Sequence, residues 1–313
     1  MTVAPLRRSC LAVPASSPRM IAKAAASAAD EVFIDLEDAC APSEKVPSRK
    51  LVVEALNSLD FDGKVRVVRI NDVTTRFCYG DVIELVSGAG ANLDSLLVPK
   101  IEDASHVHFV DHLLTGLEDD LGLERRIGLE LLIETAAGAV HLREIAEACP
   151  ARAEALHFGP GDYAVDLGIP RFELGMIDPD YPGHQWHWVM SSLAVQARAS
   201  GVQAIDGPYV DFNDRDGYLE SARRAKLLGF EGKWCIHPNQ IEWANAEFTP
   251  SRELYDEAER VLAAYAEATA AGRGAALHEG KMIDEATRKL AERLVAAGRA
   301  AGLRGRDLKR TSP

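Results

Sequence analysis

The stretch LELLIETAAG, residues 129–138, is an apolar run that ends in Glu134 and a series of small residues. Such a run is typical of a strand buried on both faces, and a polar end marks the edge of a parallel sheet where active sites lie. The pattern recurs in FIDLEDA (33–39), VRVVRIN (65–71), LLVPKIE (96–102), LHFGPGD (156–162), VQAIDGP (202–208) and WCIHPNQ (234–240). The sequence therefore predicts a parallel sheet with functional side chains along its carboxyl edge.

Helical patterns alternate with these runs, which gives eight strand–helix units. The predicted strands lie at residues 9–13, 31–35, 64–70, 93–98, 127–133, 155–158, 202–205 and 233–236. Alternation of this kind indicates an α/β protein with a parallel sheet, and eight units favour closure into a (β/α)₈ TIM barrel. A doubly wound open sheet is the alternative topology.

The composition changes after the eighth unit. Residues 251–270 and 284–302 are helical patterns rich in Ala and Glu, and the segment AGRGAALHEGK between them contains glycines typical of a loop. We therefore expect a catalytic TIM-barrel domain at residues 1–248 and a C-terminal helical lid or arm at residues 249–313.

The charge distribution excludes several classes of protein. The 313 residues carry a formal net charge of −13, with acidic and basic residues mixed throughout, so there is no basic stripe for nucleic acid or for an anionic membrane surface. No window approaches the roughly 20 apolar residues of a membrane span. The five cysteines have no CxxC spacing, so the sequence predicts neither a disulfide framework nor a zinc site built from thiolates. We expect a cytoplasmic protein that binds neither nucleic acid nor membrane.

Two carboxylates at successive strand ends are the strongest chemical signal. Glu134 follows one predicted strand, and Asp162 lies in the Gly-Pro-Gly-Asp turn after the next. In a barrel they would be neighbours, and carboxylates so placed are suited to a hard cation such as Mg²⁺. The alternative is that Glu134 caps the next helix and Asp162 stabilises a turn.

Arg69 ends an otherwise apolar strand, where a guanidinium can grip a substrate carboxylate with two hydrogen bonds. Its alternative role is an internal salt bridge to Glu37 or Asp38, which end the neighbouring strand. We expect Glu37 or Asp38 to orient a metal-bound water or Arg69.

These motifs together resemble those of the citrate lyase β-subunit-like CoA-ester lyases of the HpcH/HpaI aldolase superfamily. The resemblance rests on RRSCLAVPASSPRM, FIDLEDACAPSEK, VRVVRIN, LLVPKIE, IETAAG, FGPGDYAVDLG and GKWCIHPNQI, between residues 7 and 241. The stretches DPDYPGHQWHWVM, AIDGPYVDF and GFEGKWCIHPNQIEWANAEFTPS resemble the L-malyl-CoA/β-methylmalyl-CoA lyase branch.

The resemblance implies a reversible Claisen-type cleavage that depends on Mg²⁺, with Mn²⁺ as a possible substitute. Malyl-CoA would give acetyl-CoA and glyoxylate, and β-methylmalyl-CoA would give propionyl-CoA and glyoxylate. It also implies roles for matching residues. Glu134 and Asp162 would bind the metal, Arg69 the oxo-acid, Arg19 and Lys23 the phosphates of coenzyme A, and Ile236, His237 and Pro238 part of the coenzyme A pocket.

The C-terminal segment HEGKMIDEA resembles that of long family members, in which a lid brings an aspartate to the active site of a neighbouring subunit. Asp284 would then be the general acid/base in a homotrimer or homohexamer. Because short members end after the barrel, this segment favours a self-sufficient enzyme over a subunit of a citrate lyase complex. The alternative for Asp284 is a helix N-terminal residue that interacts with the helix dipole.

Other activities remain open at the level of sequence. A malyl-CoA thioesterase, a malate-synthase-like enzyme or a citramalyl-CoA lyase would use the same metal, arginine and aspartate. An aldolase acting on free pyruvate and a non-enzymatic regulatory barrel are further alternatives.

Overall fold

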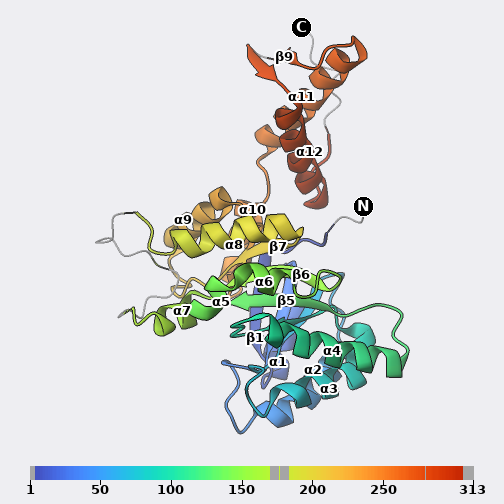
Figure 1. The fold of residues 1–313 in the computed structure, drawn as a ribbon, viewed down its shortest axis with the longest axis vertical. Helices are drawn as coiled ribbons and strands as arrows, with labels where there is room; N and C mark the ends of the chain where they lie inside the picture. The colour runs from blue at the N-terminus through green and yellow to red at the C-terminus, as the bar shows by residue number, and fades with distance from the viewer. Residues whose placement is uncertain (1–3, 170–175, 177–182, 279, 306–313) are drawn as a thin grey trace. The chain divides into compact units, whose positions relative to one another are not determined.

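The computed structural model describes residues 4–169, 176, 183–278 and 280–305. In this part of the chain, eight parallel strands close into a barrel in the order β1 to β8, and β1 pairs with both β2 and β8. Helices follow the strands and surround the barrel (Figure 1). The predicted (β/α)₈ TIM barrel is confirmed, and pairing between β1 and β8 rules out the open sheet.

The strands lie where the apolar runs placed them, within two residues at either end. They are β1 (Ser9–Pro14), β2 (Glu31–Asp35), β3 (Val65–Arg69), β4 (Ser95–Val98), β5 (Gly128–Ile133), β6 (Ala153–Phe158), β7 (Gln203–Asp206) and β8 (Gly232–Cys235). Almost every strand residue is buried, because helices cover the outer face of the sheet and the interior of the barrel is filled.

Helices connect successive strands and shield the outer face of the barrel. They are α1 (Pro18–Ala25), α2 (Lys45–Ser58), α3 (Cys78–Ala89), the 3₁₀ helix η1 (Gly90–Asn92), α4 (Ala104–Leu121), α5 (Ala136–Val140), α6 (Leu142–Glu147), α7 (Pro160–Asp166), α8 (His187–Ser200), α9 (Arg215–Leu228) and α10 (Asn239–Phe248). Their apolar faces form one core with the outward-facing strand residues.

The barrel interior has a separate apolar core between two polar layers. Phe33, Leu132 and Trp234 belong to this inner core, and the rings of Phe33 and Trp234 lie 4.5 Å apart. Because side chains alternate along a strand, the inward positions two residues away from this core are available for polar groups. Asp35, two residues after Phe33, lies at the carboxyl end of β2, where the candidate site is found.

The chain forms two compact units, Met1–Phe248 and Thr249–Pro313. The second unit contains α11 (Arg252–Ala270), α12 (Glu285–Ala300) and a small antiparallel pair, β9 (Ala276–His278) and β10 (Lys281–Ile283). We predicted a loop where β9 lies, and that prediction was wrong for Ala276–His278. Strands of three residues are too short to produce a recognisable alternation.

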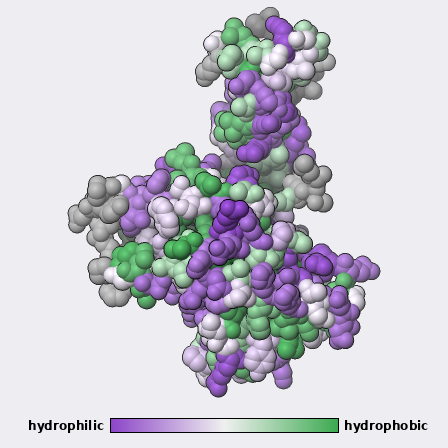
Figure 2. All heavy atoms as spheres, viewed as in Figure 1, coloured by the Kyte–Doolittle hydropathy of each residue, from purple (hydrophilic) through white to green (hydrophobic). Residues whose placement is uncertain are grey.

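No helix in the described part of the chain is long and apolar enough to cross a membrane. The face of the barrel drawn in Figure 2 carries hydrophilic residues interspersed with smaller groups of hydrophobic ones.

Candidate active site

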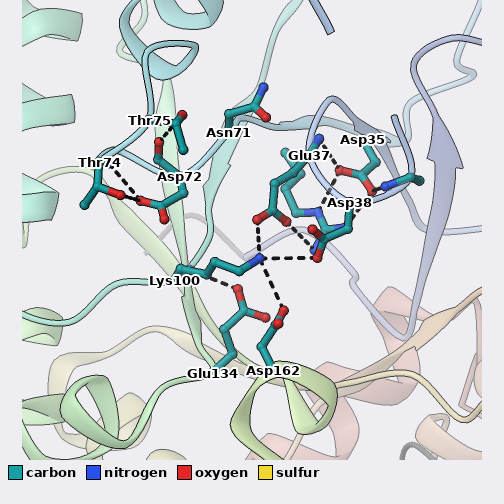
Figure 3. A network of polar contacts seen from close by, with 12 residues as sticks. Asp35, Glu37, Asp38, Asn71, Asp72, Thr74, Thr75, Lys100, Glu134 and Asp162 are labelled. Carbon is teal, nitrogen blue, oxygen red and sulfur yellow. Dashed lines mark hydrogen bonds and ion pairs between the residues drawn. The ribbon is translucent and has the colours of Figure 1, made fainter. Parts of the chain in front are cut away.

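Acidic and basic side chains from five consecutive units meet at the carboxyl end of the barrel. Each lies at the end of its strand or in the segment that follows, so barrel closure brings them to one rim. They are Asp35, Glu37 and Asp38 of the β2 unit, Arg69 of β3, Lys100 after β4, Glu134 after β5 and Asp162 in the first turn of α7 (Figure 3 labels all but Arg69).

Arg69 is held by a bidentate ion pair with Asp35. Its Nε and Nη2 atoms lie 2.8 and 2.5 Å from the two carboxylate oxygens of Asp35, and its Nη1 lies 3.1 Å from Glu37. Burial opposes ionisation of Asp35, but the Arg69 guanidinium outweighs it and keeps the pKa of Asp35 below its usual range. An internal salt bridge was the alternative role for Arg69, and the structure contains it, with Asp35 as principal partner. The alternation of side chains along β2 placed Asp35 on the inward face of the strand, but no sequence signal identified it as the partner of Arg69.

Glu37 lies beside both cations of the site. Its carboxylate contacts Arg69 and the ammonium group of Lys100, yet its Oε2 atom is buried without a hydrogen bond. Burial raises the pKa of Glu37 to about 7, and the two cations only partly offset that effect. Asp38 is exposed and contacts only Lys100 among the ion pairs of the described residues. Glu37, rather than Asp38, is therefore the residue that contacts Arg69.

The segment after β2 is fixed by hydrogen bonds from outside the site. Lys45 at the start of α2 donates to the backbone oxygens of Leu36 and Glu37 and to the side chain of Asn71. Asn71 in turn donates to the buried carboxylate of Asp81 at 2.7 Å. These contacts hold the backbone that carries Glu37 in one position.

Lys100 lies between the acidic groups, and sequence reasoning did not single it out. Its Nζ atom contacts Glu37 and lies 3.3 Å from both Asp38 and Asp162. Its backbone N–H donates to Oε1 of Glu134 at 2.9 Å. Lys100 has a φ of 50°, a left-handed conformation that costs a non-glycine residue about 1 kcal/mol or more. The stretch LLVPKIE contains Lys100, but no pattern in the sequence predicts that turn.

Glu134 is buried and packs directly against Gly159, the first glycine of the FGPGD turn. A Cβ atom at Gly159 would contact Oε2 of Glu134 and lie 2.6 Å from its Cβ atom. Glycine at position 159 therefore makes room for the side chain of Glu134. Burial raises the pKa of Glu134 to about 8 in spite of the nearby Arg69 and Lys100.

The residues present fit a hard divalent cation. Five carboxylates meet two cationic side chains in this part of the described chain, so full ionisation would leave three negative charges unbalanced. The carboxylates offer oxygen atoms as ligands, and oxygen is the ligand type that Mg²⁺ and Mn²⁺ prefer. Oε2 of Glu37 accepts no hydrogen bond, although it lies 3.1 Å from Arg69. Burial chiefly raises the pKa of Glu134, and the neighbouring carboxylates of Glu37 and Asp162 add to that effect.

The residues predicted to contact coenzyme A lie in segments that follow β1 and β8. Arg19 and Lys23 are both exposed and one turn apart on α1, and no ion pair holds either one within the described residues. Ile236 and Pro238 are exposed after β8, and the ring of His237 between them stacks on Phe212 with centroids 4.8 Å apart. Both segments begin at the rim that carries the acidic groups.

Asp284 belongs to the second unit, where it is the N-cap of α12. It is exposed, and its carboxylate accepts a 2.9 Å hydrogen bond from the backbone N–H of Thr287. Hydrogen bonds from Thr287 lower the pKa of Asp284. The capping role weighed for this residue is therefore present, and its role in proton transfer stays a prediction.

A second acidic group lies inside the barrel, toward the amino ends of the strands. The side chains of Glu31, Glu130 and His157 approach closely enough to ligate a metal. However, the Nε atom of Arg7 lies 2.9 Å from both glutamates, and Nδ1 of His157 accepts a hydrogen bond from Trp234. The guanidinium already supplies the positive charge, so we interpret this cluster as a buried ion-pair network.

Comparison with known proteins assigns the chain to a family. Residues 8–238 match the HpcH/HpaI aldolase/citrate lyase family. The chain belongs to this family. It is therefore a lyase of the HpcH/HpaI aldolase/citrate lyase family, which confirms the resemblance read from its motifs.

Individual relatives in this family cover nearly the whole chain. An L-malyl-CoA/beta-methylmalyl-CoA lyase from Cereibacter sphaeroides is 40% identical over 291 residues, which are 90% of this chain and 91% of the relative. The crystal structure of CitE from Mycobacterium tuberculosis in complex with magnesium, acetoacetate and coenzyme A has a TM-score of 0.74 and 32% identity. It covers 96% of this chain and 99% of that one.

A third family relative corrects one expectation. The citrate lyase subunit beta from Leuconostoc mesenteroides subsp. cremoris is 33% identical over 298 residues, which are 94% of both chains. A match of that extent includes most of the C-terminal unit. We expected the C-terminal unit to distinguish a self-sufficient enzyme from a citrate lyase subunit. Because a citrate lyase subunit matches over most of this unit, its presence does not make that distinction.

Proposed function

We propose that this chain is a Mg²⁺-dependent lyase that cleaves malyl-CoA to acetyl-CoA and glyoxylate, and β-methylmalyl-CoA to propionyl-CoA and glyoxylate. The observation that carries the proposal is the convergence of Glu134, Asp162 and Arg69 at one end of the barrel (Figure 3 shows the two acids). The 40% identity to an L-malyl-CoA/beta-methylmalyl-CoA lyase supports the choice of substrate.

Glu134 and Asp162 would hold the metal. Bound Mg²⁺ supplies a Lewis acid for the oxygens of the reacting end of the substrate. The raised pKa of Glu134, about 8 through burial, means that this carboxylic acid loses a proton when it becomes a ligand.

Arg69 would bind the carboxylate of the glyoxylate portion. Two of its N–H groups are committed to Asp35 and a third lies near Glu37, so the remaining N–H groups are available to a substrate. The bidentate pair with Asp35 fixes the plane of the guanidinium before substrate binds, and a fixed donor loses less entropy on binding. Asp35 is thus a positioning residue.

The reaction requires balanced proton movements. A basic group takes the hydroxyl proton as the glyoxylate carbonyl forms, the carbon–carbon bond breaks, and its electron pair passes to the thioester enolate. Protonation of the enolate carbon then gives acetyl-CoA. We assign that proton transfer to Asp284, acting on the active site of a neighbouring subunit in a homotrimer or homohexamer, with Arg19, Lys23 and the Ile236–Pro238 segment holding coenzyme A.

The first test is product analysis with malyl-CoA and Mg²⁺, with and without chelator. Equal amounts of glyoxylate and acetyl-CoA, lost on chelation, are expected. Malate with free coenzyme A would instead assign a thioesterase or malate-synthase-like activity. Citramalyl-CoA is the comparison substrate, because turnover of that ester in place of malyl-CoA would reassign the acyl specificity.

Matched variants test the site itself. Glu134→Gln removes one proposed ligand, and Glu102→Gln makes the same change at an exposed position after the preceding strand. We expect the first variant to lose metal-dependent turnover and the second to keep it. Wild-type turnover in Glu134→Gln would refute the assignment of the metal site.

A further inference from the structure

Lys100 is connected to both proposed metal ligands, by its backbone to one and by its side chain to the other. Its N–H donates to Oε1 of Glu134, and its Nζ lies 3.3 Å from Asp162. The positive φ of 50° at Lys100 belongs to the turn that makes this arrangement. Lys100 is thus a single residue in contact with both proposed ligands.

The ammonium group has other acidic partners besides Asp162. In Figure 3 it lies among Glu37, Asp38 and Asp162, with Glu37 in direct contact and Asp38 at 3.3 Å. The Lys100 side chain is a quarter exposed, whereas Arg69 is buried and fixed by Asp35. Of these two cations, Lys100 is the one whose flexible side chain can change partners without unfolding the barrel.

A divalent cation and the ammonium group compete for the same carboxylate. A metal held by Asp162 would lie close to the Lys100 ammonium group, which is 3.3 Å from Oδ2 of that carboxylate, and two cations so close repel each other at a partly buried site. Glu37 and Asp38 remain as partners for the displaced ammonium group. The residues needed for both arrangements are therefore already in place.

We propose that Lys100 is an internal counter-ion of the metal site, which neutralises Asp162 in the metal-free protein and yields it to Mg²⁺ while keeping Glu37 and Asp38. This inference rests on the proposed metal site at Glu134 and Asp162. Its consequence is that Lys100 weakens metal binding while it stabilises the acidic rim without metal.

The experiment measures binding of Mg²⁺ alone to the full-length, metal-free protein by titration calorimetry. Lys100→Met removes the competing charge, and Lys50→Met removes a charge from an exposed position on α2. We expect Lys100→Met to bind Mg²⁺ about fivefold or more tightly than wild type, because one positive charge near the metal is lost. Lys50→Met should stay within about twofold of wild type, because solvent and salt screen a distant surface charge.

Thermal unfolding provides a second readout that does not depend on turnover. Without metal, Lys100→Met leaves Glu37, Asp38 and Asp162 without their shared cation, so its Tm should fall below that of wild type. Saturating Mg²⁺ should then raise the Tm of Lys100→Met by more than it raises the Tm of wild type. Lys100→Gln, which retains a polar side chain, should behave in the same way and serves if the methionine variant is insoluble.

The outcomes separate this inference from the proposed function. Unchanged or weaker Mg²⁺ binding in both Lys100 variants, with normal binding by wild type, would overturn the counter-ion role and leave the metal site standing. Absence of Mg²⁺ binding by wild type itself would overturn the metal site and the inference together. Tighter binding in the Lys100 variants alone supports both.

Discussion

Substitution of Gly159 by alanine would press a methyl group against the side chain of Glu134. The added Cβ would lie 2.6 Å from the Cβ atom of Glu134 and closer still to its Oε2. Gly159 has φ −104° and ψ 87°, so it does not adopt the left-handed conformation that favours glycine, and the main expected effect is one of packing. Glu134 is buried and immediately follows β5, so it has little room to move away.

The expected magnitude follows from these distances. Carbon atoms in contact normally lie about 3.5–4.0 Å apart, so Glu134 or the turn must shift by about 1 Å. Overpacking of this kind costs about 1–3 kcal/mol of unfolding free energy. A metal site tolerates ligand errors of only about 0.2 Å, so we also expect the Kd for Mg²⁺ to rise about tenfold or more.

Urea unfolding and Mg²⁺ titration of purified Gly159→Ala measure these two quantities. Gly116→Ala is the matched control, because Gly116 lies within α4 and an added Cβ has no neighbour within 4 Å among the described atoms. In a helix this control should leave stability unchanged or raise it by up to about 1 kcal/mol. Wild-type stability and wild-type metal affinity in Gly159→Ala would show that Glu134 does not pack against residue 159.

Three further predictions concern buried charges. Asp35→Asn leaves Arg69 without its bidentate partner and should lower the free energy of unfolding, measured with urea near neutral pH, by about 3–5 kcal/mol. Because Arg69 lowers the pKa of Asp35, the ion pair stabilises the fold above the ordinary carboxyl pKa, and the difference between variant and wild type should shrink as the pH falls through the lowered pKa. Since burial raises the pKa of Glu134 to about 8, Mg²⁺ binding at pH 7 should release close to one proton, and the apparent Mg²⁺ affinity should rise about tenfold per pH unit up to about pH 8. Equal heats of Mg²⁺ binding in buffers of different ionisation enthalpy would contradict the release of a proton. Arg7→Met removes the cation between buried glutamates and should lower the unfolding free energy by about 3–5 kcal/mol, whereas a loss below about 1 kcal/mol would show that the network is not held by charge.

The strands were predictable because their signal is local. A run of apolar residues must be buried wherever it lies in the chain, and eight such runs alternating with helical patterns leave few topologies. The rim position of Glu134 and Asp162 followed from the same logic, since the carboxyl ends of parallel strands lie on one side of the barrel. The pair β9 and β10 was missed because three-residue strands carry no measurable alternation.

The ion-pair partner of each charged side chain depends on the closed barrel and could not be predicted from the sequence. The sequence by itself determined the barrel, the carboxyl rim, its acidic residues and the family motifs, because each rests on the order of residues along the chain. Only the tertiary structure paired Arg69 with Asp35, placed Lys100 between Glu37 and Asp162, and showed that Gly159 makes room for Glu134. Ion-pair energy and steric exclusion depend on distances of a few ångströms between residues far apart in the chain, and folding alone sets those distances.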